Sequence, residues 1–85
     1  MLLSQLPNGA HALVQRVVSA SADVGVATLR RLGELGFIAG EPVQVLRRGP
    51  GGREPLAVQV GETMFALRLL EAQCIEVQTL DVGVV

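Results

Sequence analysis

The chain has 85 residues, a formal net charge of −1 and an apolar fraction of 49%, and its only aromatic residues are two phenylalanines. This length suits one domain, and the apolar content is sufficient for a small core, which excludes a disordered chain. No apolar run approaches the ~20 residues of a membrane-spanning helix, and residues 1–5 lack the basic start of a secretory signal. We therefore expect one domain over residues 1–80 and a tail over residues 81–85.

The chain begins with a turn signal at Pro7-Asn-Gly9, followed by a predicted strand. Residues 10–18 are rich in β-branched side chains, which favours a strand, and the alternation slips near Val17-Val18, which predicts a bulge there. The polar stretch Ser19–Asp23 then offers helix-capping side chains.

A helix is predicted from Val24 to Leu35, because the apolar residues change to a helical spacing. The residues expected to form its buried stripe are Val26, Leu29, Leu32 and Leu35. Gly36 is placed to end the helix, since a left-handed position suits a residue without a Cβ atom.

After Gly40 the pattern becomes strand-like. The predicted strands are Pro42–Arg48, Leu56–Val60, Thr63–Leu69 and Ile75–Thr79, with Phe65, Leu67, Leu69, Ile75, Val77 and Thr79 directed inward. Gly61-Glu62 is predicted to form a tight hairpin turn, residues 49–55 a longer loop, and Leu70–Cys74 a single helical turn. We therefore expect a mainly β fold, in which about five antiparallel strands curl into a small, partly open barrel with one inserted helix.

The order of these motifs resembles the FeoA family. Arg31–Gly40 resembles the family's helix-to-turn segment, Val43–Pro55 its next strand and loop, and Thr63–Val77 its closing strands, so the resemblance runs from residue 1 to about residue 79. It implies an SH3-like barrel that acts in the cytoplasm as a partner of FeoB, a ferrous-iron transporter with a G-protein domain. A related barrel occurs at the C-terminus of iron-dependent repressors. The loop over residues 49–55 departs from the family pattern, because it is about one residue longer and carries Arg53-Glu54.

The chain has few side chains that could form a catalytic or metal-binding site. His11 is the only histidine and Cys74 the only cysteine; they could be neighbours in a closed barrel, but no third group stands out to orient them. The chain has no lysine and hence no phosphate-binding P-loop motif. A metal site needs three or four ligands, and no paired-ligand motif is present. We expect no enzyme activity, cofactor or metal site, although His11 with a carboxylate could supply half of a site that a second subunit completes.

Two other binding modes are also disfavoured. Proline-rich peptides bind in aromatic-lined grooves, which a chain without tyrosine or tryptophan cannot form. Six of the seven arginines lie in the middle of the chain, but glutamates are interleaved with them and stacking aromatics are lacking. We therefore expect no direct contact with nucleic acid.

The remaining reading is a protein-interaction module, in which arginines pair with carboxylates of a partner. The candidate surface consists of Phe37, Ile38, Leu46, Arg47, Arg48, Arg53 and Arg68. Leu46 either points away from the barrel or packs beneath the helix. The expected function is that of a non-enzymatic cytoplasmic accessory to ferrous-iron transport, which reaches the membrane only through its partner. The alternative is a free-standing regulatory barrel like that of iron-dependent repressors, and open strand edges make a homodimer conceivable.

Overall fold

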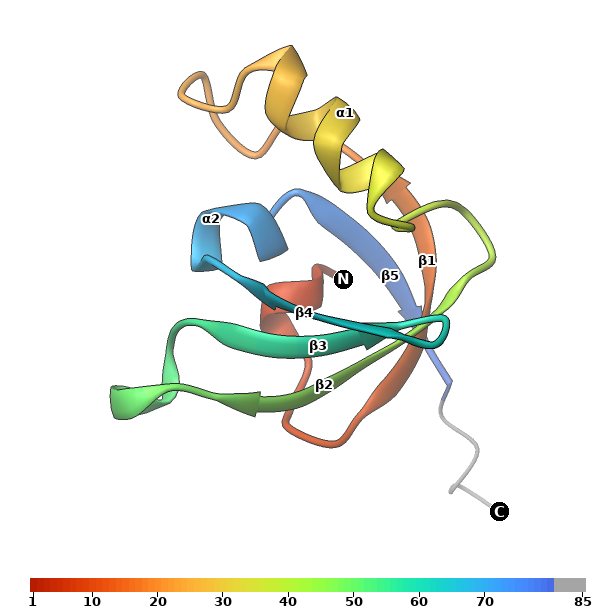
Figure 1. Ribbon diagram of the computed structural model, residues 1–85, viewed down its shortest axis with the longest axis vertical. Coiled ribbons are helices and arrows are strands. Elements are labelled where there is room, and N and C mark those ends of the chain that lie inside the picture. Colours follow the sequence, from red (N-terminus) through yellow and green to blue (C-terminus); the bar gives the residue numbers. More distant parts are fainter. Residues whose placement is uncertain (81–85) are drawn as a thin grey trace.

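A computed structural model describes residues 1–80, which form one curled antiparallel sheet of five strands with two helices beside it (Figure 1). The strands are β1 (His11–Val17), β2 (Pro42–Arg48), β3 (Leu56–Val60), β4 (Thr63–Leu67) and β5 (Ile75–Thr79), in the spatial order β4-β3-β2-β1-β5. The helices are α1 (Val26–Glu34) and α2 (Leu69–Ala72), and the 3-10 turns are η1 (Leu3–Gln5) and η2 (Pro50–Gly52). Since β4 and β5 do not pair within the described residues, the fold is the small, partly open antiparallel barrel that the strand patterns predict.

The predicted bounds of β2, β3 and β5 agree with the structure, whereas the bulge in β1 was misplaced. Val14 pairs with Val77 and Arg16 with Glu76, so the extra residue is Gln15 rather than a residue near Val17. Val17 remains in register with Ile75 because the slip occurs before it.

The predicted extent of β4 was also wrong, since the strand ends at Leu67 and Leu69 begins α2. The Arg68 backbone N–H donates to Glu71 Oε1 at 2.8 Å, and the Leu69 N–H donates to Glu54 Oε1 at 2.7 Å. These carboxylates satisfy N–H groups that the first helical turn leaves without partners. At the end of β5, Thr79 is exposed rather than directed inward.

The start of α1 differs from the prediction in two respects. Its N-cap is Gly25, without a side-chain cap, while the Ser21 hydroxyl in the preceding polar stretch accepts the Asp23 N–H instead. Val26 is 72% exposed, because the first turn of α1 does not reach the core. Further along the helix, Leu32 is buried and Leu29 is partly buried against the core.

The end of α1 is formed by Gly36, as predicted, with a φ of +115°. The Gly36 N–H donates to the Gly33 carbonyl at 3.0 Å and the Phe37 N–H donates to the Leu32 carbonyl at 3.2 Å. This pair of bonds is the Schellman arrangement, which satisfies carbonyls that the helix end would otherwise leave unpaired.

The core lies between the curled sheet and the helices, and no polar or charged residue among residues 1–80 is buried in it. Phe37 and Phe65 meet there, with ring centroids 6.1 Å apart. Leu3 and Leu6 of the N-terminal segment are buried in the same core. No helix in the described part of the chain is long and apolar enough to cross a membrane.

Candidate interaction surface

The outward side of β2, β3 and β4 forms the candidate surface, which we call the outer face and define as Leu46, Arg47, Ala57, Met64 and Ala66. A hollow of about 490 Å³ lies over Leu46 and Met64, and one of about 620 Å³ lies between Arg47 and the loop at residues 49–55. Met64 is 67% exposed. The outer face therefore offers apolar side chains to solvent beside a guanidinium group.

Leu46 is a bulge residue that decides which way the following arginines point. Val45 pairs with Val58 and Arg47 with Ala57, so Leu46 is the extra residue in β2. Leu46 lines the hollow on the outer face together with Ala57 and Met64, which favours the outward orientation over packing beneath the helix. The extra residue shifts the alternation by one position, and Arg47 takes the outward place that regular alternation assigns to Arg48.

Arg48, which was expected to contact a partner, lines the hollow beside the loop at residues 49–55 and also bonds within the chain. Its guanidinium donates to the Ser4 carbonyl at 2.9 Å, to the Leu6 carbonyl at 2.8 Å and to Asn8 Oδ1 at 2.7 Å. Arg48 thus holds the N-terminal segment against β2, and three of the five N–H groups of its guanidinium are used within the chain.

Two other predicted members of the surface do not lie on the outer face. Phe37 is 1% exposed because it packs against Phe65 in the core, so it offers no contact area. Ile38 is 53% exposed, but it lies in the turn between α1 and β2, across the molecule from η2 (Figure 1). Arg47 lies near the η2 end of β2, so Ile38 and Arg47 do not share one surface.

Arg53 and Arg68 lie at the η2 end of the sheet, near Arg47. The loop that carries Arg53 is closed by a hydrogen bond from the Gly49 N–H to the Pro55 carbonyl at 2.9 Å. The bond between Glu54 and the Leu69 N–H holds this loop beside the end of β4. Among residues 1–80, Arg47, Arg53 and Arg68 make no ion pair.

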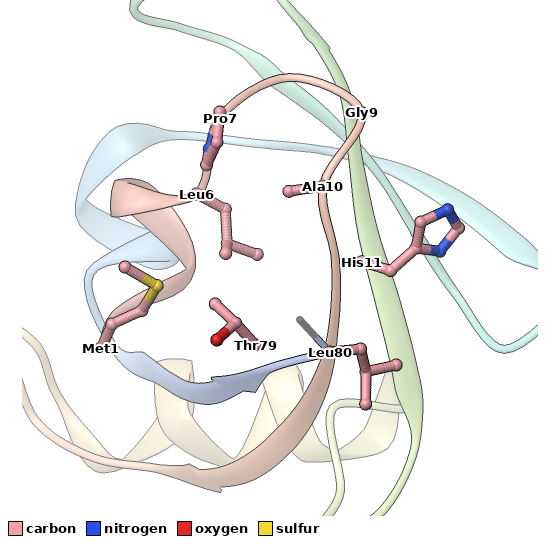
Figure 2. Close-up of a pocket in the computed structure, with 8 residues that line it drawn as sticks. All are labelled: Met1, Leu6, Pro7, Gly9, Ala10, His11, Thr79 and Leu80. Carbon is pink, nitrogen blue, oxygen red and sulfur yellow. The ribbon is translucent and has the colours of Figure 1, made fainter. Parts of the chain in front are cut away.

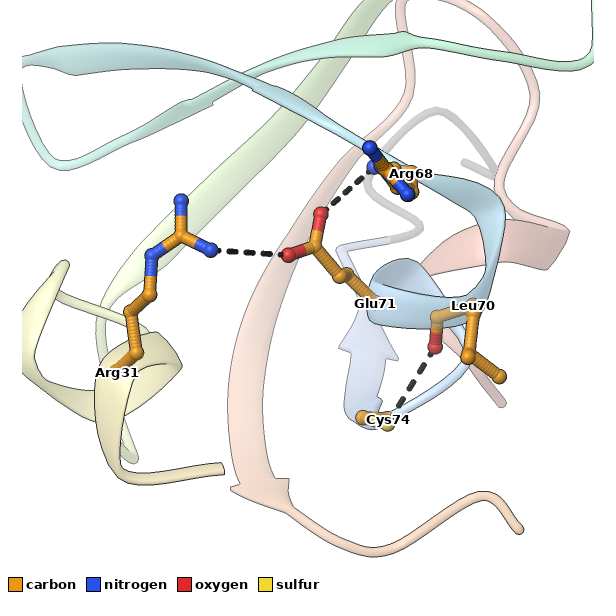
Figure 3. Close-up of polar contacts among 5 residues, drawn as sticks. All are labelled: Arg31, Arg68, Leu70, Glu71 and Cys74. Carbon is orange, nitrogen blue, oxygen red and sulfur yellow. Dashed lines mark hydrogen bonds and ion pairs between the residues drawn. The ribbon is translucent and has the colours of Figure 1, made fainter. Parts of the chain in front are cut away.

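A second polar cluster joins α1 to α2, and its members are far apart in the sequence (Figure 3). Glu71 Oε2 accepts from Arg31 Nη1 at 3.3 Å, while its other oxygen accepts the Arg68 backbone N–H. A cavity of about 450 Å³, which we call the α1 cleft, is lined by Thr28, Arg31, Ala66, Arg68 and Glu71 among others. Sequence patterns did not reveal this cluster, because the residues carry no shared motif and meet only through the fold.

His11 and Cys74 are not neighbours, which removes the nucleophile–base pair considered from the sequence. The Leu80 N–H donates to the His11 carbonyl, whereas the Cys74 carbonyl accepts the Val18 N–H, so the two residues lie at opposite ends of the β1–β5 pair. The Cys74 side chain is 0% exposed, and its Sγ donates to the Leu70 carbonyl at 3.4 Å (Figure 3).

An apolar groove of about 580 Å³ lies where the N-terminal segment meets the start of β1 and the end of β5. Figure 2 shows the His11 ring directed away from Met1 and Leu6, which lie on the groove's far side. Within residues 1–80 no three histidine, cysteine or carboxylate side chains cluster in a way that could hold a metal ion.

Comparison with known proteins identifies related domains. Residues 1–79 match the family model of the FeoA domain. The FeoA of Stenotrophomonas maltophilia, crystallised with zinc and described as an SH3 domain protein with a suggested role as a ferrous iron transport activating factor, is 49% identical, with 92% of this chain and 89% of that chain covered and a TM-score of 0.80. The FeoA of Chlorobium tepidum is 35% identical over 94% of this chain and 70% of its own, with a TM-score of 0.80.

A manganese-dependent transcriptional repressor shares the fold alone. It is 22% identical, with a TM-score of 0.75, and the match covers 94% of this chain but 41% of the repressor chain. No curated protein matches the chain significantly.

Proposed function

Because the chain belongs to the FeoA family, we propose that it is a non-enzymatic accessory protein of bacterial ferrous-iron transport that binds the FeoB-type membrane transporter. The family match over residues 1–79 is the observation that carries this proposal. The chain acts in the cytoplasm and approaches the membrane only through its partner. Binding changes transport by favouring one conformation of the transporter, which requires a different affinity for each of its states.

The proposed contact surface is the outer face together with Arg53 and Arg68. Leu46 and Met64 supply apolar contact area, while the arginines provide planar donors for carboxylates of the partner. Since Arg47, Arg53 and Arg68 have no ion-pair partner within residues 1–80, they are available to such groups. A partner with acidic side chains around an apolar patch fits this surface.

Calorimetric titration of the purified chain into detergent-solubilised FeoB-type transporter, with and without a GTP analogue, tests the proposal directly. Calorimetry suits this chain because it lacks tyrosine and tryptophan and its single cysteine is buried. Affinity that depends on the nucleotide supports regulation of the G-protein cycle, and affinity that does not supports an assembly role. Absence of binding at micromolar concentrations contradicts a direct interaction.

Charge reversal tests the surface. The double variant Arg47→Glu/Arg53→Glu should bind the transporter at least roughly tenfold more weakly, because each change places a carboxylate where the partner presents one. The single variant Arg47→Glu has a matched control in Arg30→Glu, which makes the same change of charge at an exposed arginine on α1, away from the outer face. Equal affinity of a folded double variant and the parent chain would remove the outer face from the proposal.

A regulatory barrel is the second candidate, favoured by the shared fold with the manganese-dependent repressor. In this reading the chain serves a transcription factor rather than a transporter. Failure of the calorimetric test with a folded chain would favour it.

A further inference from the structure

The two outer edges of the sheet differ in whether another segment of the chain covers them. At β5, the N-terminal segment covers the outer edge: Leu2 bridges Glu76, the Val77 N–H donates to the Met1 carbonyl at 2.8 Å, and the Met1 amine donates to the Val77 carbonyl at 3.3 Å. At β4, the outer edge has no backbone partner among residues 1–80. An uncovered edge presents N–H and C=O groups that can pair with another strand.

β4 also lacks the features that usually protect an edge strand. Its sequence Thr63-Met-Phe-Ala-Leu67 has no charge and no proline, and its register with β3 contains no bulge. The turn after β3 has two residues, so Val60 and Thr63 form a hydrogen-bonded pair and such pairs alternate along the hairpin. Met64 and Ala66 consequently direct their backbone N–H and C=O groups away from β3.

Space is available beside this edge. α1 contacts β1, and no hydrogen bond or ion pair joins it to β4 among residues 1–80. The α1 cleft of about 450 Å³ opens next to Ala66 and Arg68, at the end of the strand. An extended segment beside β4 would enter this cleft.

We propose that the occupant is a second copy of the chain, whose β4 pairs with the first β4 in an antiparallel, two-fold arrangement centred on Phe65. Met64 of each copy then lies opposite Ala66 of the other, and their outward N–H and C=O groups bond reciprocally. Shifting the pairing by one residue would bring together groups that already bond to β3. Shifting it by two would place Met64 opposite Met64 or Ala66 opposite Ala66, and one of the two reciprocal pairs would be lost.

Charge complementarity selects the same register. With Phe65 at the two-fold axis, Glu62 of each copy lies opposite Arg68 of the other, directly beyond the strand at either end. Neither Glu62 nor Arg68 forms an ion pair within residues 1–80. The segment from Glu62 to Arg68 is therefore complementary to an antiparallel copy of itself, which is the property that an isologous interface requires.

Sedimentation equilibrium of the purified chain over a range of concentrations tests the proposal. Arg68→Glu and Glu62→Arg should each weaken self-association roughly tenfold or more, because like charges then face each other at both ends of the interface. Mixing the two variants restores both opposite-charge pairs, so the mixture should form a heterodimer as tight as the parent dimer. The doubly exchanged variant Glu62→Arg/Arg68→Glu should also regain self-association.

The control is Arg30→Glu, which makes the same change of charge on α1 and should leave self-association unchanged. Circular dichroism establishes that each variant is folded, and Glu62→Arg, in an exposed turn, provides a test even if Arg68→Glu disturbs α2. Failure of the mixture to associate more tightly than either variant alone would overturn the proposed pairing.

Amide hydrogen exchange provides an independent readout by residue. Raising the protein concentration should increase protection of the Met64 and Ala66 amides, while the Thr63 and Phe65 amides are already protected by β3 in the monomer. A chain that stays monomeric at millimolar concentration would refute the proposal. So would a dimer whose Met64 and Ala66 amides remain unprotected. The measurements use the chain alone, so they do not depend on binding to the transporter.

Discussion

Arg48 stabilises the fold by joining two segments that are distant in sequence. Its guanidinium bonds to two carbonyls and one side chain of the N-terminal segment, all within 2.7–2.9 Å. Regular alternation along β2 predicts that Arg48 faces solvent, and the bulge at Leu46 reverses that outcome. Nothing in the local sequence marks this bulge, because Leu46 is apolar like its inward neighbours and shows no glycine or proline signal. The identity of the free arginine therefore could not be predicted without the pairing between β2 and β3.

Replacing Arg48 should thus affect stability rather than binding. Arg48→Ala should lower the free energy of unfolding by about 1–3 kcal/mol, because carbonyls of the N-terminal segment lose charged donors. Urea unfolding followed by circular dichroism measures this difference. Arg47→Ala is the matched control and should change stability by less than about 0.5 kcal/mol. Equal effects of the two variants would contradict the distinct roles assigned to these neighbouring arginines.

α1 shows how element boundaries follow from backbone chemistry. The end of the helix was predictable, since Gly36 occupies a left-handed position that other residues adopt only with strain. The start was not, because Gly25 caps the helix without a side chain and the nearby serines bond locally. Similarly, α2 begins earlier than periodicity suggests because carboxylates of Glu54 and Glu71 accept its first N–H groups. One of these acceptors comes from a distant loop and is invisible to local sequence patterns.

Gly33, inside α1, and Gly36, just beyond its end, should respond in opposite directions to the same substitution. Gly33→Ala should raise the unfolding free energy by about 0.5–1 kcal/mol, because alanine favours helix interiors and no atom lies within 4 Å of the added Cβ. Gly36→Ala should lower it by roughly 1 kcal/mol or more, because the residue is held at a φ of +115°. Thermal and urea unfolding of both variants provide the comparison. A stabilising Gly36→Ala change would show that the helix end rearranges without cost.

For the whole molecule, the architecture was more predictable than the surface. Alternation within β2, β3 and β5 reports burial on one side of a curled sheet, so the strand count and the small barrel follow from the sequence. The surface depends on which strand edge is covered and on which side chains bond within the chain. Both features are set by contacts between residues that are far apart in the sequence. Four of the predicted surface residues lie around the outer face: Leu46, Arg47, Arg53 and Arg68. Phe37 is buried in the core, Ile38 lies on another part of the surface, and Arg48 bonds to the N-terminal segment.

The N-terminal segment belongs to the core, and this gives a prediction for the whole fold. Leu3→Ala should reduce the unfolding free energy by about 2–5 kcal/mol, because it leaves a cavity in the core. In a domain this small, that loss should leave a substantial fraction of the chain unfolded at 25 °C. Val26→Ala is the control, since Val26 is the exposed member of the helical stripe and alanine favours helix formation. Circular dichroism melting curves distinguish the two, and a Leu3→Ala variant as stable as the parent would contradict the packing.

Because Cys74 is buried, the rate at which a reagent modifies its thiol reports how often the surrounding structure opens. A thiol reagent cannot reach a side chain that is 0% exposed and bonded to the Leu70 carbonyl. Modification under native conditions must therefore wait until the structure around Cys74 opens. When the structure closes faster than the reagent reacts, the observed modification rate divided by the rate for a freely exposed thiol gives the equilibrium constant for opening. The free energy of opening follows from this constant, and no denaturant is needed. Because the protein has no tryptophan or tyrosine, its aromatic absorbance and fluorescence are weak, and mass spectrometry of the modified thiol provides a separate way to follow its opening.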